Sequence, residues 1–465
     1  MSETAEKKKA ADRRKRHMGL GVVWCALFCD YLLMTVAIPI FPNLKTLWNV
    51  TDVEVGMLFS AKAAVQILSS PLIARVVDGW GLTPLILGLL VELVSSVGFT
   101  LSDSYGFWFG MRALQGVASA AILSAGFSHV QQLYAGDSNA LGHAMGTVTT
   151  GIISGVMAGP PLGGELYEVG KNVPFFFCAG VVGAAVLLAV VYDRGLRTTA
   201  RREADVKGDQ KGDVGGEAKV AGGGSSEGED EGTLKKICEL LRDKHVLVVL
   251  GSLMTANAAI SCLEAMIGLF LKEEHGMSEG EVGLMYIATA LPSVLGSKLG
   301  GWMGNRVGRW KTILVGMVLQ GSFYALGPKS LLSVVVVSMA GLGLGMGLVD
   351  GCAPAMLSEV GQLYHGGTGV VFTLQTAAIQ LGFVLGPVGG AAIMQSTDFQ
   401  MMSIVLGAIM VLYAPLLTIN SGITDLLKRK LEEDRKREEL AGTRTAEPPV
   451  AASQLAATLA AAGDA

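Results

Sequence analysis

Charge is scarce over most of this 465-residue chain: charged residues make up 16% of it, whereas 51% of its residues are hydrophobic. A soluble protein of this size carries roughly a quarter charged residues. The charges that are present gather in residues 2–17, 193–244 and 425–444, and long apolar segments lie between these stretches. A water-soluble globular fold is therefore excluded for most of the chain.

The chain also has few residues with the spacing that enzymes need. Its six cysteines form neither a disulfide framework nor a metal-binding pattern. No nucleotide-binding loop and no nucleophile–base arrangement is evident, and the net charge of −4 points to no particular partner. We therefore expect no enzyme activity, no catalytic residue, no metal, no cofactor and no nucleic-acid partner.

What the sequence does contain is a series of apolar segments of about 20 residues, the length that a helix needs to cross a bilayer. Helix is the expected form, because a spanning strand would alternate apolar and polar residues over about 10 positions. The sequence predicts an all-α membrane protein with twelve spans, at residues 18–41, 55–77, 82–101, 105–131, 140–166, 173–193, 245–271, 279–303, 310–328, 331–358, 366–394 and 400–419.

Basic residues gather on one side of these spans. The N-terminus, Arg75, the Arg194–Arg202 cluster and the Lys428–Arg437 tail fall on one side, while the opposite loops are mostly acidic. The bias of Lys and Arg toward the cytoplasm predicts cytoplasmic termini for this multi-pass protein. The sequence does not decide whether the membrane is that of a vesicle, a vacuole or the cell surface. It also leaves open whether Asn49, in the sequon Asn-Val-Thr, is glycosylated.

The two halves of the chain repeat at a single offset of 227 residues. EVGMLFSAKA at Glu54 aligns with EVGLMYIATA at Glu281, and GVMAGPPLGG at Gly155 aligns with GFVLGPVGGA at Gly382. Parallel six-span repeats on either side of a linker are typical of the major facilitator fold. The predicted parts are a basic N-terminus (1–17), a six-helix bundle (18–193), a disordered Gly-rich and charged linker (194–244), a second six-helix bundle (245–419) and a cytoplasmic tail (420–465).

Two motifs resemble those of the drug and amine antiporters of the major facilitator superfamily. The fourth span contains RALQGVASA, which matches the RxxQG motif of that group, and the resemblance implies a role in proton coupling for its arginine, Arg112. An arginine within a span costs a few kcal/mol, so it should face protein or water. The fifth span fits the antiporter motif GxxxxxxxxGxxxGPxxG at every fixed position, namely Gly146, Gly155, Gly159, Pro160 and Gly163.

The gating loop of the same group, GxxxDRxGRR, is only partly matched. The first copy keeps Asp78 but has Gly79 in place of the arginine, and the second copy has Asn305 in place of the aspartate but keeps Arg306 and Arg309. The charge pairs at these loops are therefore expected to be weakened.

Within that superfamily the chain resembles in particular the vesicular amine and acetylcholine transporters, over residues 19–419. CDYLLMTVAIPIFP is similar to their first span, ANAAISCLE to their seventh and GLGLGMGLVDGCAPAM to their tenth. The resemblance implies that Asp30 recognises a cationic amine, that Asp350 takes part in proton coupling, and that Glu264 assists both. The residues themselves favour the same reading, because an intramembrane carboxylate is costly and therefore points to a binding or proton-relay function.

Several positions depart from the family pattern. Lys62 should pair with an aspartate of the eleventh span, but Thr376 occupies that place, and we hypothesise that Glu92 is the partner instead. Further substrate-contacting candidates are Tyr31 and Phe383, which replace an asparagine and a tyrosine of the family, and Asn257, which stands opposite Asp30 at the 227-residue offset.

The sequence therefore predicts a proton-coupled antiporter that moves a small organic cation, most plausibly an amine, across a lipid bilayer as a monomer. Two alternatives stay open: a multidrug efflux antiporter of the plasma or vacuolar membrane, and a proton-independent facilitator or sensor on the same fold. A facilitator of neutral solutes would not need carboxylates at Asp30 and Asp350.

Overall fold

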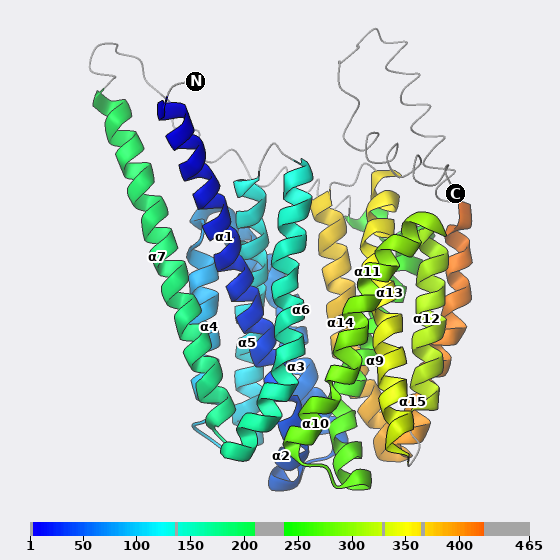
Figure 1. Cartoon of the computed structure of the whole chain (residues 1–465). Coiled ribbons are helices and arrows are strands. Elements are labelled where there is room, and N and C mark those ends of the chain that lie inside the picture. Colours follow the sequence, from blue (N-terminus) through cyan, green and yellow to red (C-terminus); the bar gives the residue numbers. More distant parts are fainter. Residues whose placement is uncertain (1–2, 135–137, 210–236, 328–330, 364–367, 423–465) are drawn as a thin grey trace. The chain divides into compact units, whose positions relative to one another are not determined.

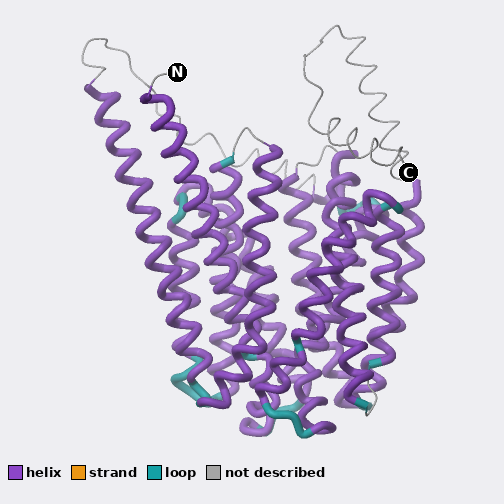
Figure 2. Tube along the Cα trace, viewed as in Figure 1, coloured by secondary structure: helices purple, strands orange, loops and turns teal. Residues whose placement is uncertain are grey.

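The computed structural model describes residues 3–134, 138–209, 237–327, 331–363 and 368–422. Within these ranges the chain is helical and contains no strand (Figures 1 and 2). The elements are, in chain order, α1 (Glu3–Val36), η1 (Ile38–Ile40), α2 (Phe41–Trp48), α3 (Asp52–Trp80), α4 (Thr83–Gly98), α5 (Tyr105–Leu133), α6 (Ser138–Val169), α7 (Val173–Asp209), α9 (Lys244–His275), α10 (Glu279–Met285), α11 (Ile287–Arg306), α12 (Arg309–Leu326), α13 (Leu332–Leu363), α14 (Thr368–Ser396), α15 (Phe399–Tyr413) and η2 (Ala414–Gly422).

Each of the twelve predicted spans coincides with helix in the described residues. In the part of the chain that the structure describes, nine helical segments are long and apolar enough to cross a membrane; they belong to α1, α3, α5, α7, α9, α10 with α11, α13, α14, and α15 with η2. The shorter apolar helix α4, together with α6 and α12, covers the other three predicted spans. The chain is thus an all-helical, multi-pass membrane protein, as predicted.

Some helix ends differ from the predicted span ends, each for a local reason. The first span was expected to reach residue 41, but α1 ends at Val36 and a 3₁₀ turn follows over Ile38–Ile40. Pro39 lies in that turn, and proline cannot donate the backbone hydrogen bond that would continue the helix. At the other extreme α7 continues to Asp209, well past residue 193, because the arginines of its end favour helix beyond the apolar segment.

The described residues group into two compact units by their contacts. The first comprises the described residues within Met1–Met34, Leu68–Val156 and Asn172–Leu234, and the second comprises those within Thr35–Ile67, Met157–Lys171 and Lys235–Ala465. The expected division into bundles 18–193 and 245–419 stays a prediction. Residues 210–236 of the expected linker and residues 423–465 of the expected tail lie outside the described residues.

In the first unit, α4 packs against α5 and α7. A Cβ on Gly88 of α4 would lie 3.0 Å from the carbonyl oxygen of Ala118, so the glycine allows α4 and α5 to approach closely. One end of the interface is closed by aromatic rings: Trp108 lies 4.7 Å from Phe99 and 5.3 Å from Phe175, measured between ring centroids. These contacts fix the position of α5 along its axis relative to α4.

In the second unit, α13 packs between α11 and α12, and α9 packs along α14. A Cβ on Gly382 of α14 would lie 2.5 Å from the carbonyl oxygen of Met254 in α9, and one on Gly386 would overlap the carbonyl oxygen of Ala258. Small residues therefore allow backbone-to-backbone contact at this interface, as is common between membrane helices.

The eighth predicted span is broken into α10 and α11 at Tyr286. The short α10 begins with a capping box, in which the Ser278 side chain accepts a hydrogen bond from the Glu281 amide and the Glu281 side chain accepts one from the Ser278 amide. At the break, the Tyr286 hydroxyl donates to the backbone oxygen of Glu264 at 2.9 Å. The equivalent position of the first repeat, Phe59, lies inside the continuous helix α3.

Candidate functional site

The first-span carboxylate, Asp30 on α1, is completely buried. It accepts a hydrogen bond from the Ser119 hydroxyl of α5. Its chain neighbour Tyr31, a predicted substrate contact, is partly buried. Because burial of a carboxylate in a helical membrane protein is costly, this position points to a function for Asp30.

The motif arginine, Arg112, lies on the same helix as Ser119 and is 2% exposed. Its guanidinium donates to the carbonyl oxygen of Met34 at 3.1 Å and to Oε1 of Gln115 at 3.1 Å. The RxxQG spacing thus has a direct structural reason, because positions i and i+3 of a helix lie on one face. Arg112, Gln115 and Ser119 form one polar face of α5 toward α1.

The antiporter motif of α6 is a row of close contacts with α1. In the first unit, a Cβ on Gly155 would lie 2.6 Å from the carbonyl oxygen of Phe28. In the second unit, a Cβ on Gly159 would overlap the Thr35 hydroxyl, and one on Gly163 would overlap the carbonyl oxygen of Val36. These glycines hold α6 against the helix that carries Asp30.

One residue of the motif does not join this row, and another contacts a different helix. A Cβ on Gly146 would have no neighbouring heavy atom within 4 Å. The carbonyl oxygen of Pro160 instead faces Gly283 of α10, within the second unit. The motif therefore combines packing positions with at least one position that packing does not explain.

The equivalent glycines of α14 contact α9 in the same way. Gly382, Gly386 and Gly390 stand 227 residues after the three close-packed glycines of α6, and each would meet α9 atoms if it carried a Cβ. The sequence repeat thus corresponds to a repeated helix-pair contact, α1 with α6 and α9 with α14.

The predicted residues of α9 and α13 lie in the second unit. Asn257, which is 3% exposed, donates to the carbonyl oxygen of Leu253 at 2.9 Å and approaches Oδ1 of Asp350 at 3.5 Å. Glu264, two turns further along α9, is 8% exposed. The structure thus brings Asn257 to Asp350, while no contact joins Glu264 to either of them among the described residues.

The predicted lysine of the second span, Lys62, is 4% exposed on α3. Its neighbours on the helix contact α14: the Ser60 hydroxyl donates to the carbonyl oxygen of Val384 at 2.8 Å, and Gln380 donates to Gln66. Lys62 belongs to the second unit and Glu92 to the first, so their pairing stays a prediction. Phe383 is partly buried on α14.

The second gating loop has an ion pair that the motif does not identify. The Arg309 guanidinium lies 2.7 Å from the Glu359 carboxylate and also donates to the carbonyl oxygen of Ala355 at 2.7 Å. Arg306 lies over the Trp302 ring, 4.8 Å from its centroid. The side chain of Asp78 lies outside the described residues.

A second polar group that the sequence did not indicate lies at the other end of the helices, in the second unit. Glu279 accepts from Asn43 at 2.5 Å and from Lys272 at 2.7 Å, and Lys272 also donates to Asn43. Beside this group, Glu168 of α6 accepts from the Gly280 amide at 3.0 Å. No local motif signals these contacts, because the residues lie far apart in the sequence.

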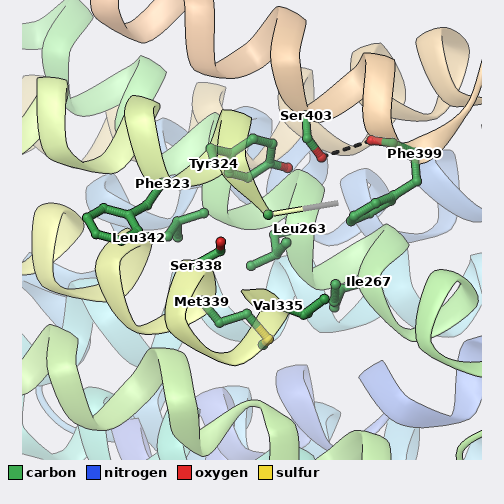
Figure 3. A pocket seen from close by; sticks show the side chains of 11 residues that line it. Leu263, Ile267, Phe323, Tyr324, Val335, Ser338, Met339, Leu342, Phe399 and Ser403 are labelled. Carbon is green, nitrogen blue, oxygen red and sulfur yellow. Dashed lines mark hydrogen bonds between the residues drawn. The ribbon is translucent and has the colours of Figure 1, made fainter. Parts of the chain in front are cut away.

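Two cavities of very different size occur in the second unit. An acidic hollow of about 640 Å³ is lined by residues that include Lys45, Asp52, Glu273 and Asp398. The other, about 20 Å³ and lined mainly by apolar side chains such as Leu263 and Met339, is drawn in Figure 3. A volume of this size holds about one water molecule, so an organic cation does not fit it.

The buried polar groups have no arrangement suited to metal chemistry in the described ranges, where no three His, Cys, Asp or Glu side chains gather as ligands. What they offer is charge: buried carboxylates on α1, α4 and α9, a partly buried one on α13, and a buried guanidinium on α5. Buried charges of this kind on several helices, together with repeated glycine-lined helix pairs, are typical of helical membrane transporters.

The chain belongs to the Major Facilitator Superfamily, whose sequence profile matches residues 23–261 and 248–461. It is 29% identical to the synaptic vesicular amine transporter of Bos taurus over 370 residues, which are 78% of this chain and 66% of that relative. It is 28% identical to the human vesicular acetylcholine transporter, over 82% of this chain and 68% of the relative. The chain thus spans just under two thirds of the length of the amine transporters it matches.

The fold is shared with solved structures at much lower identity. A bacterial homologue of the human lysosomal transporter Spinster, in an inward-facing and unoccupied conformation, superimposes with a TM-score of 0.65 at 15% identity, over 90% of this chain and 98% of that one. The family assignment makes the chain a membrane carrier and not an enzyme, as the sequence predicted.

Proposed function

We propose that the protein is a proton-coupled antiporter that moves a small organic cation of the amine class by alternating access. The observation that carries this proposal is the burial of Asp30, a carboxylate with no exposed surface in the middle of a membrane helix. An anion at this place is costly unless it meets a cation or a proton during the working cycle. Similarity to amine and acetylcholine transporters supports a cationic substrate.

Asp350 and Glu264 are the proposed proton-exchanging groups. Both lie on helices of the second unit, and Asp350 has Asn257 beside it, the residue that occupies the repeat position of Asp30. Uptake of a proton by a carboxylate removes the charge that attracts a cation, and loss of the proton restores it. Proton movement in one direction can thus drive the cation in the other, with Arg112 supporting the coupling from α5.

The Lys and Arg bias supports cytoplasmic termini for this antiporter. The acidic hollow and the Asn43–Lys272–Glu279 group then lie on the side away from the cytoplasm. Proton entry from that side and cation uptake from the cytoplasm would make the protein a vesicle- or vacuole-loading carrier, or an exporter at the cell surface.

The proposal is tested by cation-driven proton movement in proteoliposomes. The full chain is reconstituted with an internal pH-sensitive dye and an imposed gradient, and quaternary ammonium cations are added outside. A quaternary cation neither crosses the lipid nor carries a proton, so any change of internal pH requires the carrier. We expect proton efflux with wild type, none with Asp350→Asn, and full activity in the control Asp103→Asn, an exposed acid that does not line the acidic hollow.

Three results are distinguishable. Cation uptake without any proton movement would identify a proton-independent facilitator and contradict the antiport proposal. Proton efflux that accompanies many unrelated cations with similar rates would favour multidrug efflux. No uptake of any cation would contradict the proposed substrate class.

A further inference from the structure

An exposed row of side chains on α11 has no part in the proposed mechanism. Three glycines pack this helix against α13: Gly296, Gly300 and Gly304. Lys298, Trp302 and Arg306 each follow one of these glycines by two residues, which is about 200° around a helix, so they lie on the opposite face. All three side chains are exposed, Trp302 to 52%. The helix therefore presents two cations and an indole away from α13.

The same face of α11 is apolar toward the start of the helix. Leu291 is 51% and Leu295 59% exposed, and both continue the row of Lys298 and Trp302 at spacings of three and four residues. Large exposed apolar side chains on a spanning helix contact lipid, and tryptophan is enriched where the hydrocarbon meets the headgroups. Along this face the leucines, Trp302 and Arg306 therefore follow the order of acyl chains, interface and headgroups in a bilayer.

Lys298 is a cation within the membrane-spanning part of α11, one turn before Trp302. A lysine at such a place is costly unless its ammonium reaches a polar partner, and its long apolar stem allows it to extend to the headgroups. In the part of the chain that the structure describes, neither Lys298 nor Arg306 forms an ion pair, whereas Arg309 is paired with Glu359. Two cations of this face thus remain for an anion that the described residues do not supply.

The geometry at Trp302 suits a phosphate group. The Arg306 guanidinium lies over the Trp302 ring, 4.8 Å from its centroid. An arginine held on an aromatic ring keeps its N–H donors, which can bind a phosphate with two parallel hydrogen bonds. Lys298 precedes Trp302 by four residues and is therefore its neighbour on the same face, so its ammonium can approach the same phosphate from the other side of the ring.

These side chains are specific to the second half of the repeat. At the 227-residue offset the first half has a different set: Pro71, Arg75 and Gly79. The cations at Lys298 and Arg306 are therefore not needed to build the repeated helix. They do not suit the path of a cationic substrate either, because like charges repel. Binding of an anion is the role that their charge fits.

We propose that Lys298, Trp302 and Arg306 bind the headgroup of an anionic phospholipid. The phosphate lies between the ammonium and the guanidinium, the indole lies at the level of the glycerol, and the acyl chains run along Leu295 and Leu291. The Lys and Arg bias predicts that this end of α11 is cytoplasmic, and the cytoplasmic leaflet is the one that carries the anionic lipids. This lipid site does not rest on the proposed transport function.

The site is tested by lipid binding to the full chain in dodecyl maltoside micelles, followed as the rise of Tm with added dioleoylphosphatidylglycerol. We expect this rise at a lower lipid concentration than with dioleoylphosphatidylcholine, which has the same acyl chains and no net charge. Lys298→Gln and Arg306→Gln should each weaken the affinity for phosphatidylglycerol by about fivefold, and the double variant by about 25-fold, as expected for basic residues near an anionic lipid surface. The affinity for phosphatidylcholine should stay unchanged.

Two control variants separate a defined site from general attraction by charge. Arg194→Gln removes an exposed arginine of α7, outside the proposed site, and should leave the affinity for phosphatidylglycerol unchanged. Lys298→Arg keeps the charge and should bind the lipid as wild type does. If the double variant does not fold, the two single variants decide the test.

Three results would contradict the lipid site. The proposal is wrong if phosphatidylglycerol and phosphatidylcholine bind equally well, or if the glutamine variants bind phosphatidylglycerol like wild type. An equal loss of affinity in Arg194→Gln would show attraction by net charge without a site. If soluble glycerophosphate raises the Tm of wild type as much as the lipid does, the cations form a small-anion site and the assignment to a lipid is wrong.

Discussion

The glycines of α6 allow a prediction in which the first and last positions of one motif respond to substitution with opposite sign. A Cβ on Gly163 would overlap the carbonyl oxygen of Val36, whereas one on Gly146 would have no heavy atom within 4 Å. A backbone oxygen cannot swing away as a side chain does, so Gly163→Ala forces α1 and α6 apart. Gly146→Ala adds only a methyl group and removes the entropy cost of a glycine in a helix.

The expected changes in stability follow from these two environments of the added methyl group. Overpacking of a well-packed interface costs about 1–3 kcal/mol, and about 2–4 °C of Tm is lost per kcal/mol in a domain of 150–250 residues. Gly163→Ala should therefore lower Tm by on the order of 5 °C. Gly146→Ala should raise stability by up to about 1 kcal/mol, the usual difference between alanine and glycine in a helix.

Tm of the full chain in detergent, followed by intrinsic tryptophan fluorescence, is the appropriate measurement. Gly98→Ala is a graded control, because its Cβ would meet the flexible end of Met111, which can move aside; its loss should be smaller than that of Gly163→Ala. If Gly146→Ala costs as much as Gly163→Ala, or if Gly163→Ala has no effect, close helix approach is not the reason for the motif.

Three further predictions concern charged groups. Asp30→Asn should weaken phenethylamine binding on the order of 100-fold, as expected for loss of a charge-assisted contact, and unchanged affinity would remove Asp30 from the binding site. Arg309→Glu should lower Tm and transport rate because it removes the cation that lies 2.7 Å from the Glu359 carboxylate and puts a second acid near it. Arg309→Glu/Glu359→Arg should recover much of both, and a double variant as impaired as the single one would show that the pair is incidental. Lys272→Gln should lower the free energy of unfolding by only about 0.2–1 kcal/mol, because Lys272 is part-exposed beside Glu279. Tm measured at low and at high salt checks this, since the difference from wild type should vanish in about 1 M salt, where charges are screened.

The spans and the repeat could be predicted from the sequence because both depend on local pattern. Hydropathy fixed the positions of the apolar segments, and the spacing of Gly155, Gly159 and Gly163 identified a helix face that a neighbour approaches closely. Asp30 could be singled out because a lone carboxylate in an apolar segment is conspicuous. These features need no knowledge of which helix lies next to which.

The partners of the charged residues could not be predicted in this way. Glu359 lies 50 residues after Arg309, and no pattern in α13 distinguishes it from other acids. The same holds for Asn43 and Glu279, which lie more than 200 residues apart. Pairing of this kind depends on tertiary packing, which a single sequence does not display.

The positions of the helix ends could not be predicted from hydropathy either. The charged end of α7 continues as helix because arginine and alanine favour that conformation in water as well as in lipid. Conversely, the break at Tyr286 falls inside an apolar stretch, where nothing in the hydropathy marks it.

The break between α10 and α11 makes the two repeats mechanically unequal. In the second repeat, the short α10 is fastened at its start by its capping box and by Glu168, and at its end by the Tyr286 hydroxyl on α9. These contacts tie α10 to α6 and to α9, whereas the corresponding residues of the first repeat belong to the continuous helix α3. We therefore expect this end of the second repeat to move together with α6 and α9, so that a displacement of either helix is passed to α10.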